Sequence, residues 1–170
     1  MSQQPMMEVL RQVEKLLPML LDDREVWKGV DITYHPPRVE RVWRQWGTYR
    51  INLHRIHPCE RREVYLHPHP WPSAMRVRSG SYEMVRGYGA GTANPIILGT
   101  TILTAGSSYS MDQRDEWHSV RPLESVALSL MVSGPPWNRK MPIESPTAPN
   151  PLAPKAEADI MAFFAEHYVS

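Results

Sequence analysis

Two histidines that stand one residue apart, His67 and His69, are the residues of this sequence best placed for metal chemistry. Each is followed by a proline, and proline biases the residue before it toward extended backbone. In a pleated strand, residues i and i+2 project from the same face, so both imidazoles would enter one pocket together with Tyr65. The prolines cannot donate hydrogen bonds to a neighbouring strand, so the pair is expected at a sheet edge, a bulge or a barrel rim.

A third ligand is needed, because a divalent cation usually has three or more protein ligands. His118, in the stretch DEWHSV, comes at the start of an expected strand far along the chain and is in position to complete a three-histidine site. Three neutral imidazoles on one side of an octahedral Fe(II) would leave positions for O2 and a small-molecule substrate. The same ligands bind zinc, which would favour hydrolysis or hydration, so the ligand types alone do not choose the metal.

The elements that must position these histidines are mostly short strands. From Tyr49 onward the apolar periodicity is two, because Tyr49, Ile51 and Leu53 alternate with polar residues. Further runs of strand composition, separated by Pro, Gly, Ser and Asn, cover residues 62–69, 74–79, 81–86, 96–104, 117–121 and 125–132. Many brief strands with turn signals between them predict an antiparallel sandwich or barrel over residues 49–137.

The two ends of the chain are expected to be helical. Apolar residues recur at intervals of three and four over residues 6–21, which predicts an amphipathic helix that Pro18 kinks or splits. Residues 1–48 are therefore interpreted as a helical segment packed on the barrel. Residues 138–154 are rich in proline and predict an extended strap. Residues 155–170 have the pattern of a C-terminal helix, and all these parts together form one domain.

Composition narrows the function classes. The chain has 170 residues, which suits one domain, and its formal net charge of +1 without a basic stripe argues against a nucleic-acid partner. Cys59 is the only cysteine, which rules out an internal disulfide and favours a reducing compartment. No stretch is as long and apolar as a transmembrane helix, so we expect a cytoplasmic protein that does not enter a membrane. A homo-oligomer is compatible with this composition.

The histidine spacing resembles the first motif of the cupin superfamily. That motif has a histidine pair one residue apart, then a glutamate and, further on, a glycine; His67, His69 and Gly80 match it, and Ser73 stands at the glutamate position. The second cupin motif supplies another histidine after a Gly/Pro-rich turn, and residues 106–118 are a loose version of it. The resemblance implies a mainly β fold, a cupin-type antiparallel β-barrel or jelly roll, between the two helical ends.

A cupin that keeps three histidines and lacks the carboxylate resembles the thiol dioxygenases, of which cysteine dioxygenase is the best known. The resemblance implies mononuclear Fe(II), with zinc or nickel as the alternative metal, and oxidation of a small thiol-bearing acid or amine with O2. The last strand of that family carries a histidine and a tyrosine where this sequence has Met131 and Ser133, and the family's crosslinking cysteine corresponds to about Ala74. Tyr82 and Tyr88 are candidates for the role of the missing tyrosine.

An arginine would suit an acid substrate, because its guanidinium group binds a carboxylate through two parallel hydrogen bonds. The thiol dioxygenases place such an arginine on the strand before the histidine pair, where this sequence has Arg50 and Arg55 with opposite parity. Arg55 shares the parity of Ile51 and Leu53, which are expected to face the barrel interior, so Arg55 is preferred as the substrate anchor. Two further candidates share one face of a later strand: Arg76 and Arg78.

Two other functions are open on the same residues. A non-catalytic cupin would bind a metal or small ligand with the same histidines. A zinc-dependent hydrolase or isomerase would take Glu116 or Asp115, next to His118, as its base. Other charged residues, Arg41 and Glu40 among them, are expected on a solvated face. The remaining histidines are expected to be solvated or hydrogen-bonded to backbone: His35, His54, His57 and His167.

Overall fold

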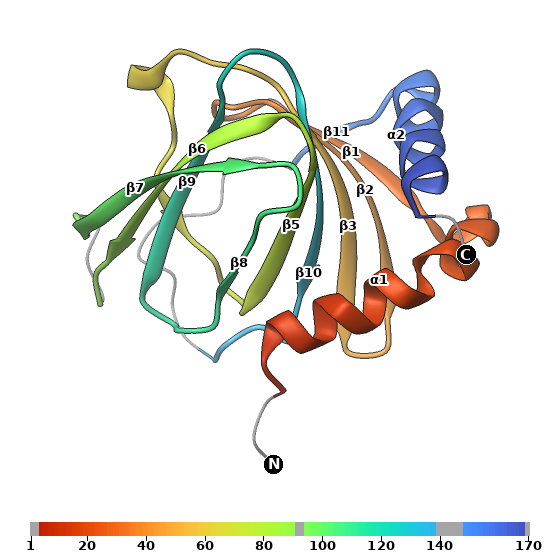
Figure 1. Ribbon diagram of the computed structural model, residues 1–170, viewed down its shortest axis with the longest axis horizontal. Coiled ribbons are helices and arrows are strands. Elements are labelled where there is room, and N and C mark those ends of the chain that lie inside the picture. Colours follow the sequence, from red (N-terminus) through yellow and green to blue (C-terminus); the bar gives the residue numbers. More distant parts are fainter. Residues whose placement is uncertain (1–3, 91–93, 139–147, 169–170) are drawn as a thin grey trace.

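The computed structural model of the chain describes residues 4–90, 94–138 and 148–168, and it contains two antiparallel sheets with helices beside the larger one (Figure 1). The larger sheet has the order β11 (Asn150–Pro151), β1 (Lys28–Ile32), β2 (Val39–Trp46), β3 (Tyr49–Ile56), β10 (Ala127–Ser133), β5 (Ser73–Ser79) and β8 (Ser108–Met111). The smaller sheet has the order β4 (His67–Pro68), β9 (Glu116–Pro122), β6 (Ser81–Tyr88) and β7 (Ile96–Thr104). The predicted mainly β, antiparallel fold with a helix near each end is confirmed.

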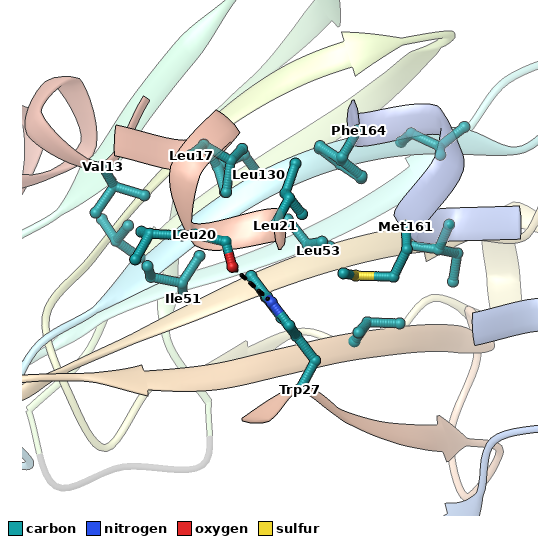
Figure 2. Packing of buried hydrophobic residues seen from close by; sticks show 14 of the residues in the cluster. Val13, Leu17, Leu20, Leu21, Trp27, Ile51, Leu53, Leu130, Met161 and Phe164 are labelled. Carbon is teal, nitrogen blue, oxygen red and sulfur yellow. Dashed lines mark hydrogen bonds between the residues drawn. The ribbon is translucent and has the colours of Figure 1, made fainter. Parts of the chain in front are cut away.

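Helices α1 (Met6–Asp22) and α2 (Pro154–His167) cover the outer face of the larger sheet (Figure 1). Helix α1 forms where the sequence has its apolar stripe, and Pro18 lies inside it. After the short 3-10 helix η1 (Arg24–Val26), the Trp27 indole donates a hydrogen bond from Nε1 to the carbonyl of Leu20 at 3.1 Å (Figure 2). These contacts close a hydrophobic cluster that holds both helices on the sheet.

The larger sheet is apolar on both of its faces. Ile51 and Leu53 of β3 pack with the helices on the outer face (Figure 2). Ile56, on the same strand, packs with Met75 and Met131 in a second cluster between the two sheets. Because both faces are buried, the alternation of apolar residues along β3 does not identify the face that lines the interior.

Gly80 carries the chain from the larger sheet into the smaller one, between β5 and β6. Its φ is +75°, a conformation that residues with a Cβ rarely adopt. A Cβ at this position would lie 2.9 Å from the carbonyl oxygen of Val126. The glycine that matched the histidine motif therefore permits a tight passage between the sheets.

Several expected elements require correction. Of residues 4–48, only those of α1 and η1 are helical, because β1 and β2 occupy much of the remainder and extend the larger sheet beyond β3. Residues 62–69 form the two-residue β4 and part of the 3-10 helix η2 (Arg61–Glu63), since the prolines interrupt strand pairing. Strand β8 has no counterpart among the expected strands.

The proline-rich strap predicted over residues 138–154 lies largely outside the described part of the chain, which omits residues 139–147. Within it, Asn150 and Pro151 form β11, which pairs antiparallel with β1, and Pro154 already begins α2. Within the ranges that the structure describes, no helix is long and apolar enough to span a membrane.

Candidate metal centre

The structure brings the three predicted histidines together. His67 of β4 is the register partner of His118 of β9, and His69 follows one residue after β4 ends. One ligand atom from each of the three lies within 4.8 Å of the others. His69 and His118 are buried, and their ring centroids are 4.5 Å apart. The i, i+2 spacing thus places both histidines of the pair on the side where β9 supplies the third.

Each imidazole is oriented through its Nδ1 atom. The Nδ1 of His67 donates to the carbonyl oxygen of Tyr65 at 3.0 Å, which leaves its Nε2 unprotonated. The Nδ1 of His69 lies 3.0 Å from the Ser73 hydroxyl, and the Nδ1 of His118 lies 3.1 Å from the Tyr109 hydroxyl. Partners at the outer nitrogen are typical of metal-binding histidines, because they fix the tautomer and the ring orientation.

The inner nitrogens have a separation that suits a metal ion. The Nε2 atoms of His69 and His118 are 2.9 Å apart. Two nitrogens bound at about 2.1 Å to one ion and at right angles to each other would be about 3.0 Å apart. Imidazole nitrogens without a carboxylate ligand suit iron, zinc, copper or nickel better than magnesium or calcium. The residues present therefore fit a transition-metal ion.

Burial keeps the three imidazoles neutral. It lowers the pKa of His67 to about 4. Burial lowers the pKa of His69 and His118 well below the ordinary range, and the proximity of the other imidazoles adds to this effect. A metal competes with protons for these nitrogens, so groups that stay unprotonated at neutral pH are ready to bind it.

The histidines face a cavity of about 220 Å³ between the sheets. Most of its walls are apolar or aromatic, and they come from both sheets and from the segments around β4: Ile32, Tyr34, Pro37, Val39, Ile56, Tyr65, Trp71, Met75, Val120 and Met131. Pockets of this kind bind small molecules through many apolar contacts and a few polar groups. The polar groups are therefore the ones that define the ligand.

Arg41 is the one side chain with a permanent charge among the described residues that line this cavity. Its Nε donates to the Nε2 of His54 at 2.9 Å, and no carboxylate of the described chain is within ion-pair distance of it. Burial lowers the pKa of Arg41 to about 10, so the guanidinium remains charged at neutral pH. The expectation of a solvated Arg41 is wrong, because β2 turns this residue toward the interior.

His54 is another residue that the sequence interpretation misplaced, as is Glu40, which is buried. His54 is buried, lines the cavity and accepts the hydrogen bond from Arg41. Its neighbours on the inner face, Asn52 and Ser129, are buried with side-chain polar atoms that have no partner in the described chain. Unpaired polar atoms of this kind are typically satisfied by water or ligand, so His54, Asn52 and Ser129 form a polar patch on an otherwise mostly apolar inner face.

The arginines expected to anchor the substrate do not line the cavity. Arg55 forms an ion pair with Glu40, which also contacts His57. The guanidinium of Arg50 lies 4.2 Å from the ring centroid of Trp43. Arg55 shares the parity of Ile51 and Leu53, but those residues face the helices, so Arg55 does not line the cavity as expected, whereas Arg41 does.

The charged groups of the later strands have partners outside the cavity. Arg76 pairs with Glu14 of α1, and Arg78 lies over the ring of Tyr168 beyond α2. Glu116, expected to serve as a base beside His118 in a zinc enzyme, forms an ion pair with Arg86. None of these charged groups lines the cavity among the residues described.

Strand β10 lies beside the cavity, but it lacks two polar side chains that the thiol dioxygenases carry in their last strand. Met131 lines the cavity and Ser133 is buried, where the resembling family has a histidine and a tyrosine. Of the two tyrosines considered as substitutes, Tyr82 is buried with its hydroxyl on the Met75 sulfur, and Tyr88 is largely exposed. A tyrosine hydroxyl does contact a predicted ligand, but it is that of Tyr109 of β8, which no sequence motif indicated.

No protein-family model and no curated protein sequence matches this chain. Solved structures share its fold. Hydroxypropylphosphonic acid epoxidase from S. wedmorenis has a TM-score of 0.51 and 12% identity, over 64% of this chain and 56% of that chain. The Fe(II) form of HppE gives a TM-score of 0.50 at 12% identity, over the same shares. This chain therefore covers little more than half of the length of these structures, and the likeness establishes a cupin-like fold without reaching the cysteine dioxygenase type.

Proposed function

We propose that this chain is a mononuclear non-haem iron enzyme of the cupin type that uses O2 to oxidise a small acid bearing a thiol. The observation that carries the proposal is the arrangement of His67, His69 and His118 beside Arg41 in one apolar cavity. Each of the three histidines has a hydrogen-bond partner at its Nδ1, so its Nε2 is available for a metal. Arg41 supplies a positive charge that has no acidic partner in the described chain. A metal centre and an anion anchor thus open into the same space.

The charges in the cavity favour an acid over an amine. Arg41 can present its two Nη atoms to a carboxylate, because its Nε is already engaged by His54. An ammonium group on the substrate would need a carboxylate, and the described cavity walls contain none. The cavity of about 220 Å³ limits the ligand to a few heavy atoms beyond its carboxylate. A short mercapto acid meets all three requirements.

Each residue then has a definable task. Fe(II) bound by the three histidines would supply adjacent positions for the thiolate and O2, and the net reaction adds both oxygen atoms to sulfur, from RS⁻ and O2 to RSO2⁻. Arg41 orients the substrate by its carboxylate, and His54 fixes the guanidinium plane. Apolar walls that include Val39, Ile56 and Val120 exclude bulk water from the reacting sulfur.

The solved structures that share the fold lend support to iron. One is named as an Fe(II) form and the other as an epoxidase of hydroxypropylphosphonic acid, so iron and an organic acid both occur in the names of enzymes with this type of fold. The support concerns the scaffold only, since the identity is 12%. The assignment to this chain rests on its own histidines and Arg41.

The test combines metal analysis with oxygen uptake. The protein is purified without added ions, its iron and zinc contents are measured, and O2 consumption is followed with 3-mercaptopropionate, cysteine and cysteamine. We expect iron near one equivalent and uptake that is fastest with 3-mercaptopropionate and slowest with cysteamine, which has no carboxylate. His118→Ala should lose both the iron and the uptake. Zinc without thiol-dependent uptake would overturn the proposal.

One observation favours a second candidate, a non-catalytic cupin that binds a metal or small ligand. Met131 and Ser133 replace side chains that the thiol dioxygenases carry in the last strand. That candidate predicts no oxygen uptake for any thiol, and a form that binds only a small ligand also predicts no stoichiometric metal. The same two measurements therefore separate the candidates.

A further inference from the structure

Strand β7 (Ile96–Thr104) forms one edge of the smaller sheet and lies across the molecule from the helices (Figure 1). It pairs with β6 on one side, and no strand of the described chain pairs with its other side. Four of its aliphatic side chains are more than half exposed: Ile96 at 75%, Ile97 at 53%, Leu98 at 66% and Ile102 at 51%. Free backbone groups beside exposed aliphatic side chains form a template for another strand.

Native proteins usually protect such an edge with charges, prolines or short strands. The other sheet edges of this protein follow that rule, because β4 and β11 have two residues each and β8 has four. Strand β7 has nine residues with neither a charge nor a proline. Strand β7 has one bulge, at Leu98, since Gly99 pairs with Arg86 and Ile97 with Gly87; the Leu98 side chain remains exposed. The free edge of β7 therefore has the properties of a surface that contacts another strand.

We propose that β7 pairs with β7 of a second copy of this chain, antiparallel and around a two-fold axis. A register that places Thr100 opposite Thr100 of the partner subunit brings Leu98 beside the partner's Ile102, and both positions are exposed. Aliphatic residues meet aliphatic residues at these positions on both sides of the axis. This self-complementarity identifies the occupant as a second copy.

The surface that would be covered is consistent with a small stable interface. Complete burial of an isoleucine or leucine side chain removes roughly 100 Å² of apolar surface, so the four exposed side chains contribute roughly 250 Å² per copy. Both copies then contribute roughly 500 Å², whereas the smallest stable interfaces bury about 1,200 Å² in total, a little over half of it apolar. The threonine side chains and the backbone edge supply the remainder. The dimer belongs at the lower end of stable interfaces.

The first test measures the mass of the full chain in solution by sedimentation equilibrium from about 1 to 500 μM, a range that brackets micromolar dissociation. The expected mass is twice the 19.6 kDa of one chain. The double variant Leu98→Lys/Ile102→Lys places lysines opposite one another, so we expect its dissociation constant to rise at least about 100-fold. The control, Met19→Lys/Val26→Lys, adds the same charge at exposed apolar positions near α1 and should remain dimeric.

The second test fixes the register. In a Cys59→Ser background, Thr100→Cys should crosslink two copies under mild oxidation, because residues directly opposite in an antiparallel pair have Cβ atoms about 5 Å apart. Thr104→Cys, which lies opposite the partner's Ile96, should not crosslink. Circular dichroism confirms that each variant is folded.

A chain that stays monomeric throughout the concentration range overturns the proposal, and so does a dimer that the two lysines leave intact. Equal crosslinking at Thr100→Cys and Thr104→Cys overturns the register. None of these positions lines the histidine cavity, so the outcome does not depend on the metal or on oxygen uptake.

Discussion

Arg41 places a positive charge in an apolar cavity that has no opposite charge among the described residues of its walls. Burial disfavours a charged group, and here it lowers the pKa of the guanidinium to about 10. A protein tolerates such an arrangement where a ligand supplies the missing charge. Arg41 is therefore the residue on which substrate choice should depend.

Arg41→Gln should raise KM for a mercapto acid about 10- to 100-fold, because a hydrogen bond to a charged group contributes about 1.5–3 kcal/mol. Arg41→Lys should recover part of this loss, since it keeps the charge but not the two parallel hydrogen bonds. Steady-state oxygen uptake measures both. Arg55→Gln serves as the control and should leave KM unchanged. An equal rise in KM for Arg55→Gln would contradict Arg41 as the specific anchor and would support Arg55, the residue that strand parity suggested.

Tyr109 would act on a bound metal through His118, whose Nδ1 its hydroxyl contacts. Tyr109→Phe removes the hydroxyl that lies 3.1 Å from the Nδ1 of His118, and loss of such a partner typically weakens metal binding about 10- to 100-fold. Tyr82→Phe is the comparison variant, because both hydroxyls contact the Met75 sulfur. The Tyr82 hydroxyl contacts that of Tyr109 but not His118, so its loss should weaken metal binding less. Competition with a chromogenic chelator measures the affinities. Equal losses in the two variants would show that packing, and not the hydrogen bond to His118, sets the affinity.

Strands β2 and β3 show how far sequence periodicity predicts this fold. The alternation of Ile51 and Leu53 correctly indicated a strand, but it could not indicate which face was interior, because α1 and α2 bury the outer face as well. Strand β2 falls in a segment predicted to be helical, because Val39 and Val42 lie on opposite faces and blur the period of two. The position of Arg41 depends on that strand, so it could not be predicted.

Glu40 ties β2 to β3 through Arg55 and to the chain beyond β3 through His57. Burial alone would raise the pKa of Glu40, but the hydrogen bonds from Arg55 and His57 outweigh it and lower the pKa to about 2. The carboxylate thus contributes stability above pH 4.5 that is lost as the pH falls toward 2.

Glu40→Gln should lower the free energy of unfolding at pH 7 by roughly 3 kcal/mol, and the difference from the unmodified chain should shrink below pH 4. Urea unfolding at a series of pH values measures both effects. Asp159→Asn removes an equal charge from an exposed pair with Lys155 and should change stability by less than about 1 kcal/mol. A pH-independent difference for Glu40→Gln would mean that the contribution is packing and not charge.

At the scale of the whole molecule, the histidine site joins segments that are distant in sequence but adjacent in the smaller sheet, where β4 and β9 are neighbours. The spacing of His67 and His69 predicted a shared face, and His118 was predicted from its place at the start of a strand. The partners of their Nδ1 atoms were not predictable, because Ser73 and Tyr109 belong to the larger sheet and reach the site only once the two sheets face each other.

Facing sheets that bury three neutral imidazoles make the stability of the metal-free protein depend on pH. The folded-state pKa of His67 is about 4, and an unfolded histidine has a pKa of about 6.5. Between these values the unfolded chain binds protons that the folded chain does not, so the free energy of unfolding falls as the pH drops from about 6.5 toward 4. His69 and His118 shift in the same direction and steepen the fall.

Metal binding should respond differently over the same range. The folded nitrogens are already unprotonated at pH 5.5, so the affinity of the folded protein for a divalent metal should change less than about threefold between pH 7.5 and 5.5. Chelation should lower Tm at both pH values, since a ligand that binds only the folded state stabilises it. Calorimetric melts with and without chelator, together with titrations of Zn²⁺ at each pH, measure these effects. An affinity that falls tenfold or more over this range would mean that the imidazoles titrate near pH 6.5 and that the cavity does not shield them from water.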